Sequence, residues 1–276
     1  MKKILAAVLT MALAVSVAGC GASKATETTA ATTAAETTTA AETTAAETTV
    51  AETTTAAETE AAVEVMSYAD YIAAELDTEV TIETYVQAKQ SWWEDKATVY
   101  TQDEDGAYFL YNMACSEEDY EKLTQGTKIR VNGYKAEWAG EVEIVDATFE
   151  IIDGNFVAPV ADVTELLGTD ELIAHQNEFV SFKGMTVEAS KDADGNDVAF
   201  LYNWDGSGQD GNDLYFNVSL NGETYTFTVE SYLCDNTTDV YAAVKELEIG
   251  DVIDMEGFLY WYEGVNPHIT AVSAAE

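Results

Sequence analysis

Two stretches of the chain decide its fold: Gly126-Thr-Lys-Ile-Arg-Val-Asn-Gly133 and Gly250-Asp-Val-Ile-Asp-Met-Glu-Gly257. Seven residues after each of them comes a further glycine, Gly140 in the first case and Gly264 in the second. Aromatic residues occupy matching places between these glycines, Tyr134 with Phe258 and Trp138 with Tyr262. A self-similarity at a spacing of 124 residues indicates a duplicated domain and not a solenoid of short units.

The residues around each repeat predict three strands, a helix and two more strands. In the first unit the expected strands begin at Val80, span 98–101 and 107–112 and, after a helix from Ser116 to about Leu123, span 128–136 and 142–151. In the second unit they span 179–189, 214–220, 224–232, 252–262 and 267–273, with a helix at 238–247 and an insertion at 196–213. Ser116 followed by three acids is typical of a capped helix start, and Asn221-Gly222 favours a tight hairpin. We also expect helices at 67–76 and at 163–176, the latter broken at Gly168.

This order of elements is that of the five-stranded OB barrel, which places its helix between the third and fourth strands. The predicted fold is mostly β, with two tandem OB-like barrels at 66–155 and 156–276. The pattern resembles the tandem OB-fold domains of bacterial exported lipoproteins. The resemblance implies a binding protein but no particular ligand, because OB folds take oligonucleotides, oligosaccharides and peptides alike.

The first residues are typical of an export signal. Lys2 and Lys3 precede a mostly apolar run at 4–17, which is short for a membrane span. Val17-Ala18-Gly19-Cys20 resembles the lipobox of bacterial lipoproteins, which implies a signal peptide at 1–19 and a lipid on Cys20. Residues 20–65 are then a tether rich in Ala, Thr and Glu, expected to be disordered because it has no apolar face. We therefore predict a protein anchored to the membrane by lipid and facing outside, on a surface of the Gram-positive type.

The charge of the chain is strongly negative, with 51 acidic and 12 basic residues and a formal net charge of −39. Eight of the acids and three of the bases precede Met66, so the folded part carries a net charge of −34. Nucleic-acid binding draws much of its affinity from Lys and Arg, and the chain has one arginine, Arg130. From this balance we predict no nucleic-acid partner.

Catalytic and metal-binding patterns are sparse. His175 and His268 have no serine or cysteine partner at a recognisable spacing, and two scattered histidines do not build a zinc site. A loop that resembles the start of a calcium site contributes the candidate ligands Asp192, Asp194 and Asn196, but the later glutamate of such sites is replaced by Asn203. We predict no enzyme activity and no cofactor, with calcium as the one metal to consider. A solvated turn is the alternative for that loop.

Cys115 and Cys234 hold matching places in the two units. They are free buried thiols or, alternatively, a disulfide.

Aromatic residues are the most informative candidates for a site. The seven candidates for ligand binding fall in loops that border the ligand face of OB barrels: Trp92, Trp93, Trp138, Trp204, Tyr260, Trp261 and Tyr262. Flat rings beside carboxylates suit sugars, so the leading hypothesis is a non-enzymatic, surface-anchored module for an extracellular glycan or peptide, with a cell-wall or protein partner. The alternative is an envelope scaffold whose aromatics pack between the barrels. A carboxylate-dependent hydrolase is a third hypothesis.

Overall fold

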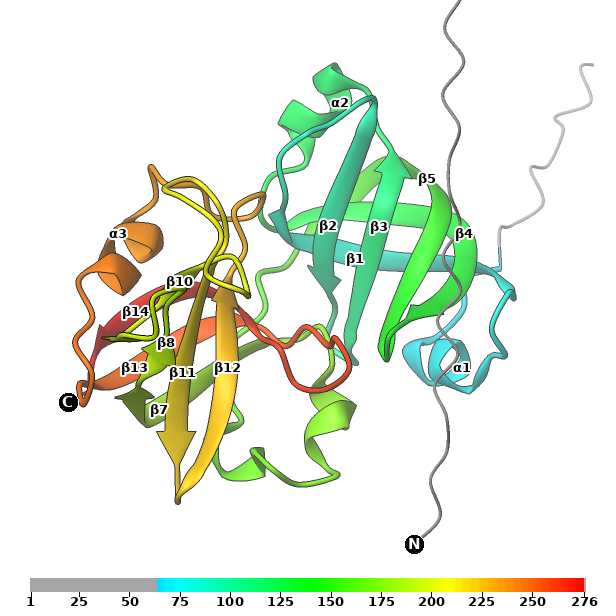
Figure 1. The fold of residues 1–276 in the computed structure, drawn as a ribbon. Coiled ribbons are helices and arrows are strands. Elements are labelled where there is room, and N and C mark those ends of the chain that lie inside the picture. Colours follow the sequence, from blue (N-terminus) through cyan, green and yellow to red (C-terminus); the bar gives the residue numbers. More distant parts are fainter. Residues whose placement is uncertain (1–63, 276) are drawn as a thin grey trace, which may run out of the picture. The chain divides into compact units, whose positions relative to one another are not determined.

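The computed structural model describes residues 64–275, which fold into two β-barrels (Figure 1). Cys20 and residues 20–63 of the expected tether lie outside the described residues. Within residues 64–275, no helix combines the length and the apolar character needed to cross a membrane.

The first barrel is closed by five strands in the order β1-β2-β3-β5-β4. Its elements are α1 (Tyr68–Ala73), β1 (Glu79–Lys89), β2 (Lys96–Gln102), β3 (Ala107–Ala114), α2 (Glu117–Lys122), β4 (Thr127–Trp138) and β5 (Glu141–Asn155). Antiparallel pairing joins the neighbours except β3 and β5, which run parallel and close the ring. Alternate residues of β1 are buried, as the period of a half-buried strand requires. The predicted order of three strands, helix and two strands is confirmed.

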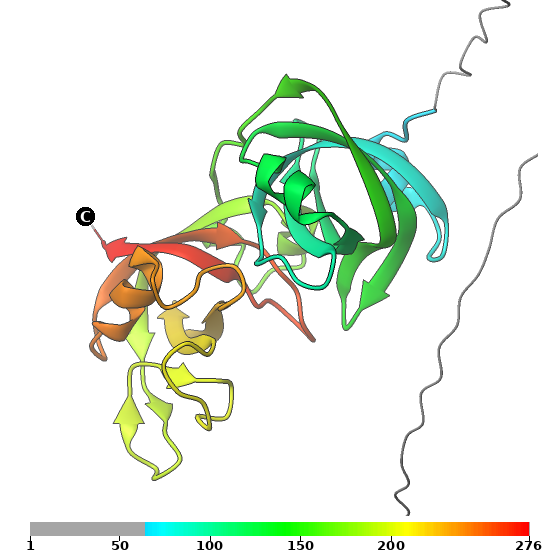
Figure 2. The same cartoon turned by 90° about the horizontal axis from the view of Figure 1, so that it is seen from above.

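The second barrel repeats this plan with additions. Its elements are β7 (Phe179–Glu188), β11 (Leu214–Leu220), β12 (Glu223–Val229), α3 (Asp239–Lys245), β13 (Val252–Phe258) and β14 (His268–Ala274). Strand β7 pairs with both β11 and β13, and β12 runs parallel to β14, which closes the five-stranded ring. Short strands lie outside the ring: β6 (Ala161–Asp162), β8 (Ser190–Lys191), β9 (Asp197–Val198) and β10 (Leu201–Tyr202). Viewed from above, the segment that carries β8 to β10 projects from the second barrel (Figure 2).

The repeated glycines have a steric reason. A Cβ atom on Gly133 would lie 2.7 Å from Ile144 Cγ2, and one on Gly257 would lie 2.3 Å from the carbonyl oxygen of His268. Both glycines stand where the register of a strand pair shifts, β4 against β5 and β13 against β14. A bulge bends a strand and brings neighbouring backbones close together. In both barrels the equivalent strand bends at a glycine, because a side chain would not fit there.

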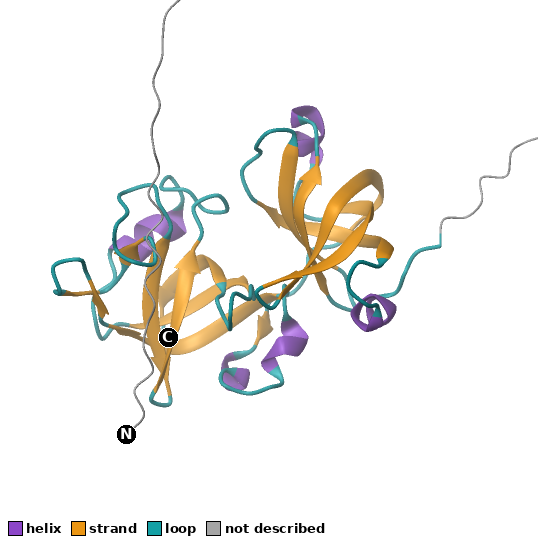
Figure 3. Cartoon of the chain, turned by 45° about the vertical axis from the view of Figure 1, so that its right-hand side comes forward, coloured by secondary structure: helices purple, strands orange, loops and turns teal. Residues whose placement is uncertain are grey.

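Local predictions from the sequence hold at the helix start and the hairpin. The Ser116 hydroxyl accepts a hydrogen bond from the backbone N–H of Asp119 at 3.1 Å and caps α2. Asn221 and Gly222 form the turn between β11 and β12, both with positive φ. The helix expected at 163–176 with a break at Gly168 is present as two short 3-10 helices on either side of that break, η1 (Thr164–Leu166) and η2 (Leu172–His175) (Figure 3). The chain turns at Gly168 with φ +81°, and Val163, Leu167 and Leu172 are buried in the core of the second barrel.

Each barrel has its own apolar core, and a small third cluster joins them. Tyr100 of β2 and Phe109 of β3 meet Phe258 at the end of β13, and all three are buried. The Tyr100 and Phe258 rings stack with centroids 4.4 Å apart and planes at 18°. An aromatic contact of this kind adds to the burial of the rings themselves, so the two barrels are fastened by a compact apolar joint.

Candidate functional site

A cavity of about 780 Å³ lies beside this joint and is walled by both barrels. The lining residues are Gln90, Phe109, Tyr111, Trp204, Tyr215, Glu230, Tyr260, Tyr262, Glu263, Asn266 and His268. Six of the eleven are aromatic, and none is a lysine or an arginine. Concave, largely apolar sites with a few polar groups are typical of small-molecule binding, so we take this cavity as the candidate site.

The loop between β13 and β14 forms one wall, and the first barrel holds it in place. Backbone N–H groups of this loop donate to the β4–β5 turn, Trp261 to Glu141 Oε2 at 2.9 Å and Glu263 to the carbonyl of Ala139 at 2.7 Å. Tyr260 stacks on His268 with centroids 4.3 Å apart and meets Phe109 edge-on at 5.4 Å. The wall therefore depends on contacts between the barrels.

The rim of the cavity is formed by exposed rings. Trp204 is 75% exposed, Tyr262 49% and Tyr111 46%, and they come from the insertion, the β13–β14 loop and β3 respectively. Exposed large aromatic residues around a hollow are typical of a binding surface. A smaller adjoining cavity of about 300 Å³ shares Gln90 and Tyr111 with the first and adds Trp93 and Tyr232.

Glu230 supplies a carboxyl group inside the aromatic walls. It follows β12, and its oxygens accept backbone hydrogen bonds from Tyr232 at 3.1 Å and Leu233 at 2.9 Å. Burial raises the pKa of this carboxyl to about 7, because water no longer stabilises the charged form. A group with that pKa gains or loses its proton in response to a small change in its surroundings.

His268 is buried at the back of the cavity. Its Nδ1 lies 2.7 Å from the hydroxyl of Tyr100, which belongs to the other barrel. Burial lowers the pKa of His268 to about 3, so its ring is neutral at physiological pH. The lining of the cavity thus contains no positive charge, and its acidic groups are the carboxyls of Glu230 and Glu263.

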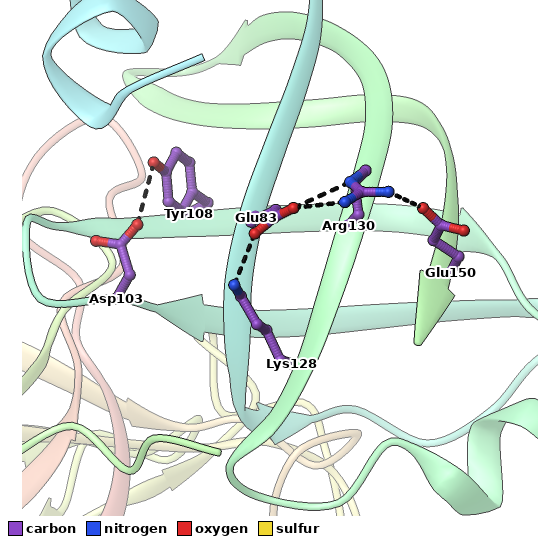
Figure 4. Close-up of polar contacts among 6 residues, drawn as sticks. All are labelled: Glu83, Asp103, Tyr108, Lys128, Arg130 and Glu150. Carbon is purple, nitrogen blue, oxygen red and sulfur yellow. Dashed lines mark hydrogen bonds and ion pairs between the residues drawn. The ribbon is translucent and has the colours of Figure 1, made fainter. Parts of the chain in front are cut away.

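Basic residues of the described chain are mostly engaged elsewhere. The carboxylate of Glu83 forms ion pairs with Lys128 Nζ at 2.6 Å and with Arg130 Nη2 at 2.7 Å (Figure 4). Arg130 also forms an ion pair with Glu150. The same view shows Tyr108 donating to Asp103 at 3.5 Å. Four further lysines form ion pairs with nearby acids: Lys122, Lys183, Lys191 and Lys245. Positive charge is therefore largely neutralised locally, and the remaining surface is acidic.

The seven aromatic candidates divide between the cavity and other places. Trp204, Tyr260 and Tyr262 line it. Trp261 packs instead over Gly140 of the other barrel, and the indole of Trp92 donates to the carbonyl of Cys115 at 2.9 Å. Trp93 borders the smaller cavity, and Trp138, 62% exposed at the end of β4, lines neither.

Several residues that line the cavity were not among the ligand-binding candidates predicted from the sequence, because those candidates were chosen from loops. Phe109 and Tyr111 lie in β3, Tyr215 lies in β11, and Glu230 and His268 adjoin strand ends. One feature of the sequence pointed to this part of β3: the segment Phe109-Leu-Tyr-Asn112 recurs as Phe200-Leu-Tyr-Asn203. Nothing in that recurrence shows which copy faces a cavity.

The candidate calcium loop forms a turn held by its own side chain. Asp192 Oδ1 accepts the backbone N–H of Asp194 at 3.0 Å and of Asn196 at 2.8 Å, and Oδ2 accepts the Asn196 side chain. No group of three or more metal-ligating side chains occurs within residues 64–275. Calcium binding at Asp192, Asp194 and Asn196 remains a prediction from the sequence.

Of the three cysteines in the sequence, Cys115 and Cys234 lie within the described residues, and both are buried free thiols and do not form a disulfide.

Comparison with known proteins finds no matching family model and no matching curated protein. Similar solved structures exist, however. A crystal structure of the Ifi202 HINa domain in complex with 20-base-pair double-stranded DNA is 12% identical and covers 73% of this chain and 97% of its own, with a TM-score of 0.32. A murine DNA-binding protein bound with double-stranded DNA is 11% identical, covers 71% and 96%, and has a TM-score of 0.34. A replication protein A heterotrimer bound to single-stranded DNA is 11% identical, covers 70% and 49%, and has a TM-score of 0.27.

Two predictions from the sequence are corrected by these structures. A glycan, peptide or scaffold protein as the partner is contradicted, and so is the exclusion of nucleic acid, because the similar chains are bound to DNA. The exclusion was wrong because it weighed net charge alone, whereas barrels also hold bases by stacking them on aromatic rings. A likeness at this level describes the barrel type only, so the ligand of this chain is argued below from its own residues.

Proposed function

We propose that this protein binds a small organic cation with an apolar body in the cavity between its barrels. The observation that carries the proposal is the carboxyl of Glu230 set within aromatic walls that contain no lysine or arginine. A ring attracts a cation over its face, by about 0.5–2 kcal/mol according to how dry the site is. A carboxylate adds direct attraction, and the acidic surface raises the local concentration of cations.

The cavity suits a cation better than a neutral or anionic ligand. Bringing an anion next to Glu230 and Glu263 would place like charges together, and Lys96, which borders the smaller cavity, does not line this one. A cation would favour the ionised form of Glu230 and lower its pKa, so binding should release a proton near neutral pH. The amides of Gln90 and Asn266 offer hydrogen bonds to a hydroxyl on the same ligand.

The setting of this site is proposed from the sequence. We propose a non-enzymatic protein anchored by lipid on Cys20 and facing outside the cell, because the export signal and the lipobox-like Val17-Ala18-Gly19-Cys20 occur in the right order. In that setting the cavity would sample extracellular solutes. Incorporation of radiolabelled fatty acid tests the anchor, and Cys20→Ala should abolish it while leaving cation binding intact.

Calorimetric titration of the full chain tests the ligand. The probes are choline, benzyltrimethylammonium and the neutral carbon isostere of choline, with tryptophan fluorescence as a second readout. We expect both cations to bind and the isostere to bind at least about tenfold more weakly, since a charged interaction within a partly buried site exceeds about 1.4 kcal/mol. Equal affinity for choline and its isostere would overturn the proposal.

Matched variants locate the site. Glu230→Gln and Trp204→Ala should each weaken cation binding, while Glu104→Gln and Trp138→Ala, which alter residues outside the cavity, should leave it unchanged. Trp204 and Trp138 are both well exposed, so neither change should disturb folding. Double-stranded DNA and an oligo-dT strand complete the panel. Tight DNA binding that Trp204→Ala abolishes, with no response to either cation, would replace a cation by nucleic acid as the ligand.

A further inference from the structure

The smaller cavity beside the candidate site differs from it in charge. Its volume is about 300 Å³, and its lining contains one lysine, Lys96, and no acid. The lining of the larger cavity contains two acids, Glu230 and Glu263, and no base. Because Gln90 and Tyr111 line both cavities, the two adjoin and together form a groove with an acidic part and a basic part.

Lys96 is the one basic side chain of residues 64–275 that no other group in this range engages. Nine basic side chains lie in the range. Six form ion pairs with acids: Lys122, Lys128, Arg130, Lys183, Lys191 and Lys245. Two donate to backbone carbonyls: Lys89 and Lys135. The ammonium of Lys96 is therefore available to an anion that a ligand supplies, in a folded part with a net charge of −34.

A tight turn fixes Lys96 next to Trp93. The backbone N–H of Lys96 donates to the carbonyl of Trp93 at 2.9 Å, and the N–H of Trp93 donates to the carbonyl of Lys96 at 3.2 Å. Glu94 and Asp95, the two residues between them, both have positive φ, as the central residues of a tight primed hairpin turn do. These two acids line neither part of the groove, whereas Trp93 and Lys96 line the same part.

The smaller cavity, like the larger one, is walled by both barrels. The backbone N–H of Ser91 in the first barrel donates to the carbonyl of Tyr232 in the second at 2.7 Å, and the Ser91 hydroxyl donates to the same oxygen at 3.2 Å. Trp93 is 66% exposed and Tyr232 63%, so the exposed rings of the larger cavity continue into the smaller one. Aromatic rings pack well against an apolar chain, and the groove can therefore hold a methylene linker between its two charged parts.

These charges complement a ligand with two charged ends. We propose that the ligand of the groove is dipolar: a small organic cation joined by an apolar linker to a carboxylate, with the cation beside Glu230 and the carboxylate at Lys96. This inference deepens the function proposed above and rests on it. A single lysine matches the single charge of a carboxylate better than the higher charge of a phosphate monoester. The reversed pose is disfavoured, because it would place the carboxylate beside Glu230 and Glu263.

The length of the linker decides whether the carboxylate helps or hinders binding. A short linker keeps the carboxylate beside Glu230 and Glu263, where like charges repel it. A longer linker carries it past Tyr111 to the part of the groove that Lys96 lines, where it is attracted. Lys96 is exposed, and an exposed ion pair is weak and is screened by salt. We therefore expect a gain in affinity of about threefold at low salt, which added salt removes.

Calorimetric titration of the full chain tests the inference. The probes are glycine betaine, 4-trimethylammoniobutanoate and 6-trimethylammoniohexanoate, each compared with its methyl ester, which keeps the cation and the linker but lacks the negative charge. Glycine betaine should bind more weakly than its ester. At a longer linker the order should reverse, with the acid about threefold tighter than its ester. Acids that bind no better than their esters at any length would overturn the proposal.

Matched variants assign the reversal to Lys96. Lys96→Met removes the ammonium and keeps an apolar side chain, so the longer acids should lose their advantage over the esters. Lys191→Met removes the same charge from β8, outside both parts of the groove, and should keep that advantage. Both lysines are exposed, so neither change should disturb folding. An advantage of the acid that persists in Lys96→Met would overturn the proposal.

Choline separates this inference from the proposed function. If choline binds and no acid is favoured over its ester, the dipolar ligand is refuted and the proposed function stands. If neither choline nor any acid or ester binds, the proposed function fails and the dipolar ligand fails with it. The two-ended pose requires 6-trimethylammoniohexanoate to lose affinity in both Lys96→Met and Glu230→Gln. A loss in Lys96→Met alone would place the ligand outside the larger cavity and would overturn that pose.

Discussion

His268 should make the protein sensitive to acid, and His268→Asn should remove that sensitivity. The residue is 6% exposed, and burial lowers the pKa of its ring from 6.5 to about 3. Between those values the unfolded chain binds a proton that the folded protein does not, so stability present above about pH 6.5 is lost as the pH falls. Asparagine places an amide near Nδ1 beside Tyr100 but does not titrate.

The size of the effect follows from the shift. Each pH unit across that window changes the free energy of unfolding by about 1.4 kcal/mol, so the full shift corresponds to about 5 kcal/mol as an upper bound. Glu141 acts in the opposite sense. Burial raises its pKa, which gives stability that is complete below about pH 4.5 and is lost as the pH rises through about 8. Over the shared window the two slopes oppose each other, and Glu230, with a pKa near 7, adds to the slope of Glu141.

Urea denaturation at a series of pH values measures this balance. We expect the difference in unfolding free energy between wild type and His268→Asn to fall by about 1.4 kcal/mol per unit as the pH is lowered from about 6.5. Taking a difference cancels the carboxyl groups that both proteins share. A difference that stays constant across this range would show that His268 titrates normally in the folded state and would refute the buried, neutral ring.

Three further outcomes are expected. Phe258→Ala should lower the free energy of unfolding, measured by urea denaturation, by about 3 kcal/mol, since it removes a buried ring from the joint between the barrels. An unchanged free energy of unfolding would mean that the joint is not well packed. Gly133→Ala should lower the melting temperature, because a Cβ at Gly133 would lie 2.7 Å from Ile144 Cγ2 and 2.9 Å from the carbonyl oxygen of Val145; an unchanged melting temperature would contradict the steric role of the bulge. Cys115 and Cys234 should react with a thiol reagent only on unfolding, because both are buried and burial raises the pKa of each thiol to about 11; rapid labelling of the folded protein would show that they are accessible.

The barrels could be predicted from the sequence because their determinants are local. Gly133 and Gly257 stand at bulges, Ser116 caps a helix, and Asn221-Gly222 closes a hairpin, each through its own backbone and nearest neighbours. The break at Gly168 was predicted for the same reason. The 3-10 form of the two short helices at 163–176 was not predicted, because their apolar residues are buried by packing on the second barrel and tertiary contacts override local propensity.

The cavity could not be predicted in the same way, because it arises between the repeats. Trp138 and Tyr262 hold equivalent places in the two repeats, yet Tyr262 lines the cavity whereas Trp138, 62% exposed, does not. Two copies of a unit that meet through one asymmetric contact place equivalent residues in different surroundings. Sequence symmetry alone cannot say which copy of a residue will face the contact.

The charge of the chain gains its meaning only when it is placed on the structure. A net charge of −34 on the folded part describes a long-range field that attracts cations and weakens as salt screens it. The carboxyl of Glu230 is different in kind, because its aromatic surroundings exclude water and screen it little. If a cation occupies the cavity, added salt should slow its association more than it speeds its release. Steering belongs to the surface as a whole, whereas retention belongs to Glu230 and the rings around it.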